Sequence, residues 1–325
     1  MKAIRAHQFG GPEVLKLEDV ADPTPGAGEV LVRLHAAGVN PADTYMRGGT
    51  YAVKPNLPYI PGAEGAGIIE AVGANVVELK TGDRVWISST TAGRMQGAYA
   101  EKAVCAADQV HPLPDHLSFE QGAAINIAYV TAYRALFDRA RMTAGETVLI
   151  HGATGGVGLA AVQIASHFGA IVLGTGGTDT GRKLAEQYGA TKTFDHHDPE
   201  YLDQIKSATR GEGCDVIIEM LANVNLDKDL GLLAHGGRVC VIGNRGRVEI
   251  DARQTMQKES TITGVMYFGG GPAAVQRAIA AISAGLRDGA FVPHVCQSFP
   301  LAEASKAHEA VMKSSGAAGK ITLTM

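Results

Sequence analysis

The sequence is short of cysteine and of net charge, and each shortage excludes a class of protein. Cysteine occurs four times in 325 residues, at Cys105, Cys214, Cys240 and Cys296, without a Cys-x-x-Cys unit. This excludes a zinc ribbon and disfavours a disulfide framework, so we expect buried free thiols in a reducing compartment. Lysine and arginine number 29 against 33 acidic residues, a net charge of −4. Such a charge gives no overall field that would attract nucleic acid or an anionic membrane.

Long hydrophobic runs are also absent. No stretch approaches the ~18 apolar residues of a membrane span, and the N-terminal MKAIRAHQFGG lacks the apolar core of a signal peptide. We therefore expect a protein of the cytoplasm whose first residues form a strand. At ~150 residues per domain, the length indicates about two domains.

Glycine is abundant, at 41 residues, and with proline it separates short strands in the first third of the chain. Strands are predicted at 30–37, 66–72, 83–87 and 99–104. Short strands punctuated in this way favour a partly closed, barrel-like β domain.

The pattern changes near residue 118, where Ser118 and Gln121 have the spacing of a capping box. A helix is predicted over 128–139, and strands then alternate with helices. Continuous apolar strands are predicted at 147–150, 170–173, 191–194, 215–219 and 238–242, with helices at 157–168, 182–188 and 201–209. Such runs are buried on both faces, so they predict a parallel sheet covered by helices. Helices at 273–284 and 301–312 and a strand at 320–323 complete the chain.

A glycine-rich turn, TVLIHGATGGVG, follows the first of these apolar strands. Its glycines at 152, 155, 156 and 158 form a variant of GxGxxG between a strand and a helix. Small residues there let the backbone approach a pyrophosphate at the helix N-terminus, so the turn predicts dinucleotide binding. The alternative is a tight turn that binds no ligand.

The next strand ends in Leu173-Gly174-Thr175-Gly176, where NAD-binding folds usually carry an acidic residue for the ribose hydroxyls. No acid occurs in that segment, and Arg182 and Lys183 follow on the predicted helix. Both features favour the 2′-phosphate of NADPH, with Lys183 as the first choice of partner. The alternative is that these two cations only form a solvated helix face.

Seven strings carry a family resemblance over nearly the whole chain: FGGPEVLKLE, GVNPADTYMRGGTY, LPYIPGAEGAG, AYVTAYRAL, HGATGGVGLAAVQIA, EMLANVNLDKDLGLLAHGGRV and SGAAGKITL. Through them the sequence resembles the zeta-crystallin-like NADPH:quinone oxidoreductases of the medium-chain dehydrogenase/reductase superfamily. The resemblance implies an α/β protein in which a Rossmann-type parallel-sheet domain, 125–264, is inserted into a GroES-like, partly closed β-barrel catalytic domain formed by 1–124 and 265–325. It implies NADPH in the cleft between them, and a homodimer or homotetramer.

The same superfamily contains zinc alcohol dehydrogenases, and the comparison with them predicts that this chain holds no metal. Asn40 stands where those enzymes place a ligand cysteine, and Ala63, before Glu64, stands where they have a histidine. Neither suits zinc. The cysteine-rich lobe of their structural zinc is also missing.

The resemblance places Asn40, Tyr45 and Thr131 near the nicotinamide as catalytic residues. Tyr45 would donate a hydrogen bond or shape the slot, unless it is an ordinary loop tyrosine, and Asn40 has the alternative role of a turn former. Val265–Tyr267 would reach the nicotinamide side, although an apolar strand or a subunit interface would explain them too. The implied cofactor-binding residues are Tyr45, Thr154, Gly155, Gly156, Val157, Gly177, Lys183, His196, Asn225, Ile242, Gly243, Asn244, Arg245, Val265, Met266 and Tyr267.

The activity implied is the reduction of a quinone by NADPH. A quinone accepts electrons easily, so hydrogen bonds and water exclusion suffice without a metal. Reduction of enones or enoyl thioesters is the second interpretation. A crystallin-like structural protein or an RNA-binding protein is the third, which the intact cofactor turn, the charge of −4 and the lack of an RNP-like aromatic string disfavour.

Overall fold

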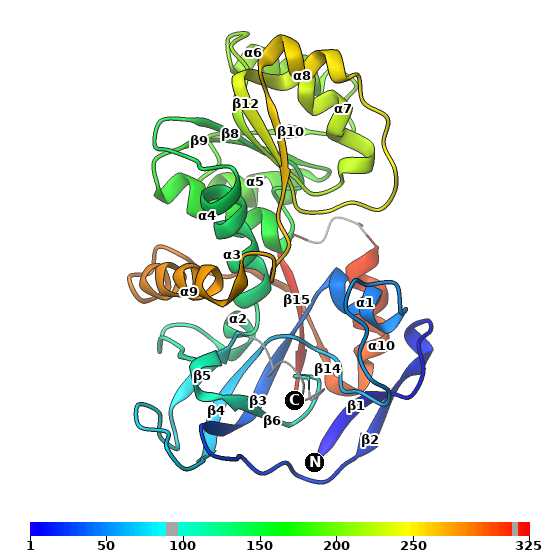
Figure 1. The fold of residues 1–325 in the computed structure, drawn as a ribbon, viewed down its shortest axis with the longest axis vertical. Helices are drawn as coiled ribbons and strands as arrows, with labels where there is room; N and C mark the ends of the chain where they lie inside the picture. The colour runs from blue at the N-terminus through cyan, green and yellow to red at the C-terminus, as the bar shows by residue number, and fades with distance from the viewer. Residues whose placement is uncertain (89–96, 314–317) are drawn as a thin grey trace. The chain divides into compact units, whose positions relative to one another are not determined.

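The computed structural model describes residues 1–88, 97–313 and 318–325 and separates the chain into two compact units. Unit 1 consists of Met1–Ile127 and Val292–Met325, and unit 2 of Ala128–Phe291. Both chain termini therefore belong to unit 1 (Figure 1). The predicted fold class, a parallel-sheet domain inserted into a β domain, is confirmed.

Unit 1 is built on a seven-stranded sheet with the order β14-β15-β3-β4-β5-β7, in which β6 also pairs with β3. Its centre is the eleven-residue strand β3. Polar and apolar residues alternate in its first part and its last residues are apolar, so the strand is buried along most of its length. The neighbouring strands are antiparallel except for β14 and β15. The strands are β3 (Glu29–Val39), β4 (Gly65–Val72), β5 (Arg84–Ile87), β6 (Lys102–Ala106), β7 (Val110–Pro112), β14 (Val295–Pro300) and β15 (Lys320–Thr324).

Short helices and a separate hairpin complete unit 1. The predicted capping box is confirmed: Ser118 Oγ accepts the Gln121 N–H, and the Gln121 side chain accepts the Ser118 N–H. The strand predicted at 99–104 begins only at Lys102. The remaining elements are β1 (Lys2–Ala6), β2 (Leu15–Asp19), α1 (Pro41–Arg47), α2 (Phe119–Gly122) and α10 (Ala304–Met312), with 3-10 turns at Pro12–Val14, Ala107–Gln109 and Leu301–Glu303.

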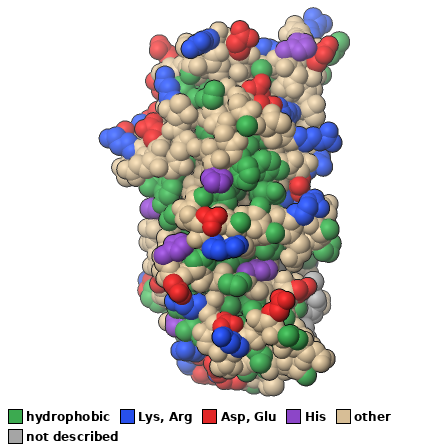
Figure 2. Space-filling view, turned by 90° about the vertical axis from the view of Figure 1, so that its left-hand side faces the viewer, with side chains coloured by type: hydrophobic (Ala, Val, Ile, Leu, Met, Phe, Trp, Pro, Cys, Tyr) green, Lys and Arg blue, Asp and Glu red, His purple; other side chains and the backbone are tan. Residues whose placement is uncertain are grey.

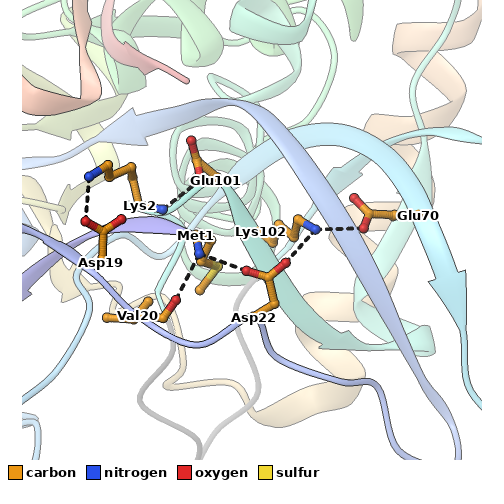
Figure 3. A network of polar contacts seen from close by, with 8 residues as sticks. All are labelled: Met1, Lys2, Asp19, Val20, Asp22, Glu70, Glu101 and Lys102. Carbon is orange, nitrogen blue, oxygen red and sulfur yellow. Dashed lines mark hydrogen bonds and ion pairs between the residues drawn. The ribbon is translucent and has the colours of Figure 1, made fainter.

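A polar network ties the N-terminus to this sheet (Figure 3). The Met1 ammonium donates to Val20 O at 2.9 Å and to Asp22 Oδ1 at 2.8 Å. Lys102 Nζ joins Asp22 to Glu70, at 2.8 Å from each carboxylate. The network thus connects the start of the chain to β6 and β4 through partly exposed groups, with the Lys102 side chain 21% and the Asp22 side chain 51% exposed.

Unit 2 contains a six-stranded sheet in which every neighbouring pair is parallel, with the order β10-β9-β8-β11-β12-β13. In chain order this is 3-2-1-4-5-6, the doubly wound arrangement, and the direction of winding reverses between β8 and β11. The strands are β8 (Thr147–Ile150), β9 (Ile171–Gly176), β10 (Lys192–Asp195), β11 (Cys214–Glu219), β12 (Leu233–Val241) and β13 (Thr261–Gly264). The helices are α4 (Gly156–His167), α5 (Asp179–Gln187), α6 (Tyr201–Ala208), α7 (Ala222–Leu232), α8 (Ala252–Lys258) and α9 (Gly271–Arg287).

The boundaries of unit 2 differ from the predicted domain of 125–264, because residues 265–291 pack with it. The reason is visible in the segment that precedes β8. There α3 (Asn126–Tyr133) continues into a π-helical segment (Arg134–Arg139). The Arg134 guanidinium donates to the carbonyl oxygens of Met266 and Tyr267, each at 2.6 Å. These contacts hold the segment after β13, and with it α9, against unit 2.

The surface agrees with the balance of charges in the sequence. On the face that Figure 2 shows, lysine and arginine side chains are interspersed with acidic ones. Among the described residues, no helix combines the length and the apolar character needed to cross a membrane.

Candidate functional site

The parallel sheet of unit 2 brings most of the predicted cofactor residues to one edge. Since its strands all run in the same direction, their carboxyl ends lie together, and ligands of such sheets bind there at the point where winding reverses. Sixteen residues are predicted at the cofactor; the fifteen in unit 2 follow β8 (Thr154, Gly155, Gly156, Val157), β9 (Gly177, Lys183), β10 (His196), β11 (Asn225), β12 (Ile242, Gly243, Asn244, Arg245) and β13 (Val265, Met266, Tyr267). Tyr45 lies in unit 1.

The glycine-rich turn has the close backbone packing that its sequence predicts. Gly152 has a φ of +60°, and a Cβ on Gly158 would lie 2.1 Å from Gly152 O. Gly155 is the N-cap of α4, where an added Cβ would meet nothing nearer than Gly152 O at 3.6 Å. The first turn of α4 therefore presents open space and unpaired N–H groups, which is a cradle suited to a pyrophosphate.

The glycines at the end of β9 have a packing reason as well. A Cβ on Gly174 would lie 2.8 Å from Ala153 Cβ, and one on Gly176 would lie 2.5 Å from Thr154 Cγ2. The strand and the cofactor turn are also joined by the Ala153 N–H, which donates to Thr175 O at 2.9 Å. Because β9 touches the turn at Gly174 and Gly176, these two positions have no room for the acidic side chain that NAD-binding folds usually carry there.

The two cations after β9 have different surroundings. Arg182 is held against the strand end, because its guanidinium donates to Gly176 O at 3.0 Å and pairs with Asp195 at 2.9 Å. Lys183 is mostly exposed and pairs with Asp179 at 2.7 Å, which raises the pKa of Lys183 through the hydrogen bond to that carboxylate. Each cation already has an acidic neighbour. The negative charges of Asp195 and Asp179 therefore weaken the positive potential that Arg182 and Lys183 would offer to a 2′-phosphate.

His196, which the resemblance assigns to the adenine end of the cofactor, lies beside Gly177 in the structure. A Cβ on Gly177 would lie 3.0 Å from His196 Nε2 and 2.8 Å from His197 Nε2. Partial burial lowers the pKa of His196. A neutral imidazole next to a glycine is compatible with a flat ligand at this strand end.

The segments after β11 and β12 are bonded to each other. Ile242 N–H donates to Glu219 O at 2.8 Å, and Asn225 Nδ2 approaches the Glu219 carboxylate at 3.3 Å. Gly243 passes so close to Met220 that a Cβ on it would lie 2.1 Å from the Met220 carbonyl oxygen. Further along, Arg245 N–H donates to Asn223 Oδ1 at 2.9 Å. Val265 N–H in turn donates to Val241 O at 3.0 Å.

A buried cluster of His151, Glu219 and Asp229 lies behind this edge, and sequence reasoning missed it. His151 Nε2 is 2.9 Å from Asp229 Oδ1 and 3.9 Å from Glu219 Oε2. Burial alone would lower the pKa of His151, but the two carboxylates raise it above its usual value. Burial also raises the pKa of Glu219. The signal was present in the sequence, because a histidine and a glutamate each follow or end an apolar strand.

The same three side chains bring one ligand atom each within 4.8 Å, a separation that would suit a metal ion. A protonated imidazole between the two carboxylates offsets one of their negative charges without a metal. His151 Nδ1 also lies 3.2 Å from Thr175 Oγ1, which accepts the Gly152 N–H. The cluster therefore supports the cofactor turn through a hydrogen-bond chain.

In unit 1, α1 carries Asn40 and Tyr45. Asn40 is the N-cap of α1, and its N–H donates to Asp43 Oδ2 at 2.9 Å, so the turn-forming role is real. Its side chain is nevertheless committed elsewhere: Nδ2 donates to Glu64 Oε1 at 2.8 Å, and Oδ1 accepts from Lys320 Nζ. Tyr45 is half-buried on the same helix. Thr131, the third predicted catalytic residue, is buried on α3 in unit 2.

The residues at the zinc position of related dehydrogenases do not fit a metal. Ala63 has only a methyl group, and the Glu64 carboxylate is fully buried with its oxygens bonded to Asn40, Lys320 and the Ile127 N–H. The Lys320 ammonium contacts both Glu64 and Asn40. A positive charge from the protein itself therefore occupies this place.

The sequence matches two family descriptions, "Alcohol dehydrogenase GroES-like domain" over residues 26–115 and "Zinc-binding dehydrogenase" over 156–284. The quinone oxidoreductase of Homo sapiens is 52% identical over 100% of this chain and 98% of its own length. The Escherichia coli quinone oxidoreductase solved with NADPH has a TM-score of 0.88 at 30% identity, with both chains fully covered. A structure titled an NAD-dependent alcohol dehydrogenase has a TM-score of 0.93 at 29% identity, also with full coverage.

The fold and the relatives define a two-domain oxidoreductase of the medium-chain dehydrogenase/reductase superfamily, and within it the chain belongs to the quinone oxidoreductase family.

Proposed function

We propose that this protein reduces quinones with NADPH. The proposal depends chiefly on one edge of the parallel sheet in unit 2. There the N-terminus of α4, capped by Gly155 and open to a ligand, lies after β8, and the carboxyl ends of the five other parallel strands lie at the same edge. The identity of 52% with a quinone oxidoreductase over the whole chain supports the substrate class. The structure solved with NADPH supports the cofactor.

The residues of unit 2 would hold the cofactor along that edge. The N–H groups of Gly156 and Val157 would bind the pyrophosphate, because they begin α4 and have no partner within the helix, while Gly155, whose N–H donates to Gly152 O at 3.1 Å, would give the phosphate room to approach. Gly177, Lys183 and His196 would contact the phosphorylated ribose and the adenine. The segments at Asn225, Ile242–Arg245 and Val265–Tyr267 would line the remainder.

When bound, NADPH supplies the hydride. The protein's part is to orient the quinone, exclude water and donate hydrogen bonds to the oxygen that becomes negative. Tyr45 has a phenolic O–H for this purpose, and Thr131 has a hydroxyl that would hold the nicotinamide, whereas the side-chain amide of Asn40 is already bonded to Glu64 and Lys320. None of these roles requires a metal, which agrees with the ammonium found between Asn40 and Glu64.

We also infer an assembly of two or four copies in the cytoplasm. The outer strand β13 and the segment after it expose Ile262, Met266 and Phe268, with Met266 52% and Phe268 57% exposed. Apolar side chains beside an unpaired strand edge suit pairing with a second copy. All four cysteines are free thiols, as expected in a reducing compartment. Light scattering after size-exclusion chromatography and cell fractionation test the two statements.

The activity is tested by steady-state oxidation of NADPH with benzoquinones and naphthoquinones against alkenals and a crotonyl thioester. We expect kcat/KM to be highest for quinones. A higher value for the enone or thioester substrates would identify an enoyl reductase instead.

A charge placed at the cofactor turn separates catalysis from folding. Gly155→Asp should fold normally, because a Cβ fits there and aspartate is a good N-cap. Its carboxylate would repel the pyrophosphate, so NADPH binding and quinone turnover should fall at least about tenfold. Gly155→Ser is the matched neutral control and should lose much less. Equal behaviour of the two variants would place the pyrophosphate elsewhere.

A further inference from the structure

Two histidines lie beside the last glycine of the segment that follows β9. Strands β9 and β10 are parallel, and their register pairs Asp195 with Gly176, so the next residues, His196 and Gly177, come side by side. The imidazoles of His196 and His197 both point toward this glycine. A Cβ on Gly177 would lie 3.0 Å from His196 Nε2 and 2.8 Å from His197 Nε2. Two ring nitrogens therefore border the space that a side chain at 177 would fill.

These nitrogens are available to a ligand. Both histidines are exposed, and their rings contact each other with centroids 4.4 Å apart. Within the parts of the chain that the structure describes, neither imidazole forms a hydrogen bond or an ion pair; the bond of His197 to Asp195 comes from its backbone N–H. The two nearby cations differ in this respect, because Arg182 pairs with Asp195 and Lys183 pairs with Asp179.

The place that Gly177 occupies is the one at which dinucleotide-binding sheets recognise the ribose. The residue after the second strand, about 20 positions beyond the glycine-rich turn, usually extends a carboxylate to the ribose 2′-hydroxyl. Gly177 has no side chain, and two imidazoles lie beside it instead. A phosphate monoester carries about −1.5 to −2 charges near pH 7 and accepts hydrogen bonds at three oxygens, so two N–H donors suit it better than a ribose hydroxyl.

We propose that His197, acting with His196, determines the specificity for NADPH: the two imidazoles bind the 2′-phosphate and take up a proton when it binds. The preference for NADPH over NADH is then larger at about pH 6.5 than at about pH 8.5, because imidazoles lose their protons over that range. A lysine or an arginine in the same place would give a preference that does not change with pH. The inference rests on the NADPH of the proposed function and is independent of the quinone.

The charges around the two rings favour an anion. Burial is the largest cause that lowers the pKa of His196, and the charge of His197 is the next. Asp195 raises this pKa, whereas His151 and Arg182 lower it further. The positive potential that opposes a proton on His196 attracts a phosphate dianion. The bound dianion in turn favours the charged imidazole, so binding is accompanied by proton uptake.

Calorimetric titration of the unmodified protein with NADP⁺ and NAD⁺ tests the proposal without catalysis, since the two ligands differ only in the 2′-phosphate. In buffers of different ionisation enthalpy at about pH 7.5, NADP⁺ should bind with a larger uptake of protons than NAD⁺. The Kd of NADP⁺ should rise about fivefold from pH 6.5 to 8.5, as for one exposed charge contact, while that of NAD⁺ stays constant. Equal proton uptake for the two ligands would overturn the proposal.

Two substitutions of His197 separate charge from packing, and both should fold because the residue is exposed. His197→Asn has no titrating group, so at pH 6.5 it should weaken NADP⁺ about fivefold, leave NAD⁺ unchanged and reduce the proton uptake. His197→Arg keeps a cation at every pH and should bind NADP⁺ equally well at pH 6.5 and 8.5. Unchanged binding and proton uptake in His197→Asn would refute the assignment, as would an equal loss for NAD⁺.

His235→Asn is the matched control. His235 is another exposed histidine of unit 2, 4.0 Å from Glu259, but it lies near the amino end of β12 and so at the opposite edge of the sheet. Its substitution should change neither affinity nor proton uptake; a loss equal to that in His197→Asn would contradict the proposal. If NADP⁺ binds with proton uptake but no quinone is reduced, the proposed function fails and the specificity assignment stands. If quinones are reduced while NADPH and NADH serve equally at every pH, the assignment fails and quinone reduction stands.

Discussion

His151 Nε2 lies 2.9 Å from Asp229 Oδ1 in the interior of unit 2, with the side chains 5% and 0% exposed. The groups that face the imidazole are Asp229 and Glu219, which favour its charged form, and Lys228, which opposes it. Because the carboxylates raise the pKa of His151 above 6.5, the folded state binds a proton more tightly than the unfolded chain. The stabilisation is complete below pH 6.5 and is lost as the pH rises through the raised pKa.

Asp229→Asn should therefore lower stability most at pH 6, by about 3–5 kcal/mol, since a buried imidazolium would lose its partner. The pH dependence above 6.5 should become shallower. Chemical denaturation at several pH values checks this. Glu18→Gln is the control: the His7–Glu18 contact of 2.7 Å is partly exposed, and its loss should be below about 1 kcal/mol. Equal effects of the two substitutions would contradict the buried-pair explanation.

Asp43 gives a second pH-dependent prediction. Burial, followed by the nearby Glu64 charge, raises the pKa of this carboxyl from 3.8 to about 7, although the Asn40 N–H and Lys320 lower it. A raised carboxyl pKa means that the folded protein loses stability as the pH climbs from about 4 to about 7. Asp43→Asn keeps an oxygen for the Asn40 N–H but cannot ionise, so it should remove that loss, up to about 4 kcal/mol.

Unfolding curves of both proteins between pH 4 and 8 test this prediction. Asp83→Asn is a suitable control, because Asp83 accepts the Lys80 N–H at 2.9 Å in the same local pattern on the protein surface. Parallel curves for the unmodified protein and Asp43→Asn would show that Asp43 stays in one protonation state.

Lys183→Ala should raise KM for NADPH about fivefold and leave KM for NADH unchanged, since only NADPH carries the 2′-phosphate. The effect is modest because an exposed ion contact is worth up to about 1 kcal/mol. Arg182→Ala should weaken both cofactors, since Arg182 also binds Gly176 O and Asp195. Lys206→Ala, at the exposed Asp203 pair on α6, is the control. Equal losses for NADPH and NADH in Lys183→Ala would assign Lys183 to the fold.

Tyr45→Phe should lower kcat/KM for quinones about tenfold, as expected for one lost hydrogen bond to a developing charge. NADPH binding should weaken little. Tyr201→Phe, on α6 in the other unit, should change neither quantity and serves as the control. Unchanged kinetic constants in Tyr45→Phe would show that its hydroxyl does not contact the substrate.

Elemental analysis of the purified protein should find well under one zinc per chain, and chelators should not change the rate. The expected reason is that Lys320 occupies the position between Asn40 and Glu64. Stoichiometric zinc would contradict it. Zinc that disappears in Asp229→Asn would locate the ion at the His151 cluster.

The elements that sequence reasoning predicts well are those with strong local patterns. The strands 147–150 and 215–219 are uninterrupted apolar runs, and both appear as β8 and β11 nearly as predicted. Helices α1 and α7 have weak local signals, because α1 is only seven residues long and α7 contains two Asn and two Asp residues, which favour turns when judged alone. The change from α- to π-helix at Arg134 has no local signal, since it accompanies contacts with residues 132 and 133 positions away.

The candidate site divides in the same way. The glycine-rich turn and the strand-end segments were predictable because strand–turn–helix order fixes where they lie. The partners of Asn40 were not, because Lys320 opens an apolar strand and the contact with Glu64 spans 256 positions. Buried ionic contacts of this kind depend on which strands become neighbours in the sheet. That order is a property of the fold, and a local pattern does not contain it.

The crowding at the end of β9 restricts how cofactor preference can be re-engineered or can drift during evolution. An acidic side chain at 174 or 176 would press on Ala153 or Thr154 within 2.8 Å or 2.5 Å, and so would distort the turn that receives the pyrophosphate. At Gly177 the obstacles are the tips of two histidine rings, His197 Nε2 at 2.8 Å and His196 Nε2 at 3.0 Å, and both are side-chain atoms that can rotate away. Of these three glycines, Gly177 is therefore the position at which a single mutation can introduce selectivity for NADH while the architecture survives.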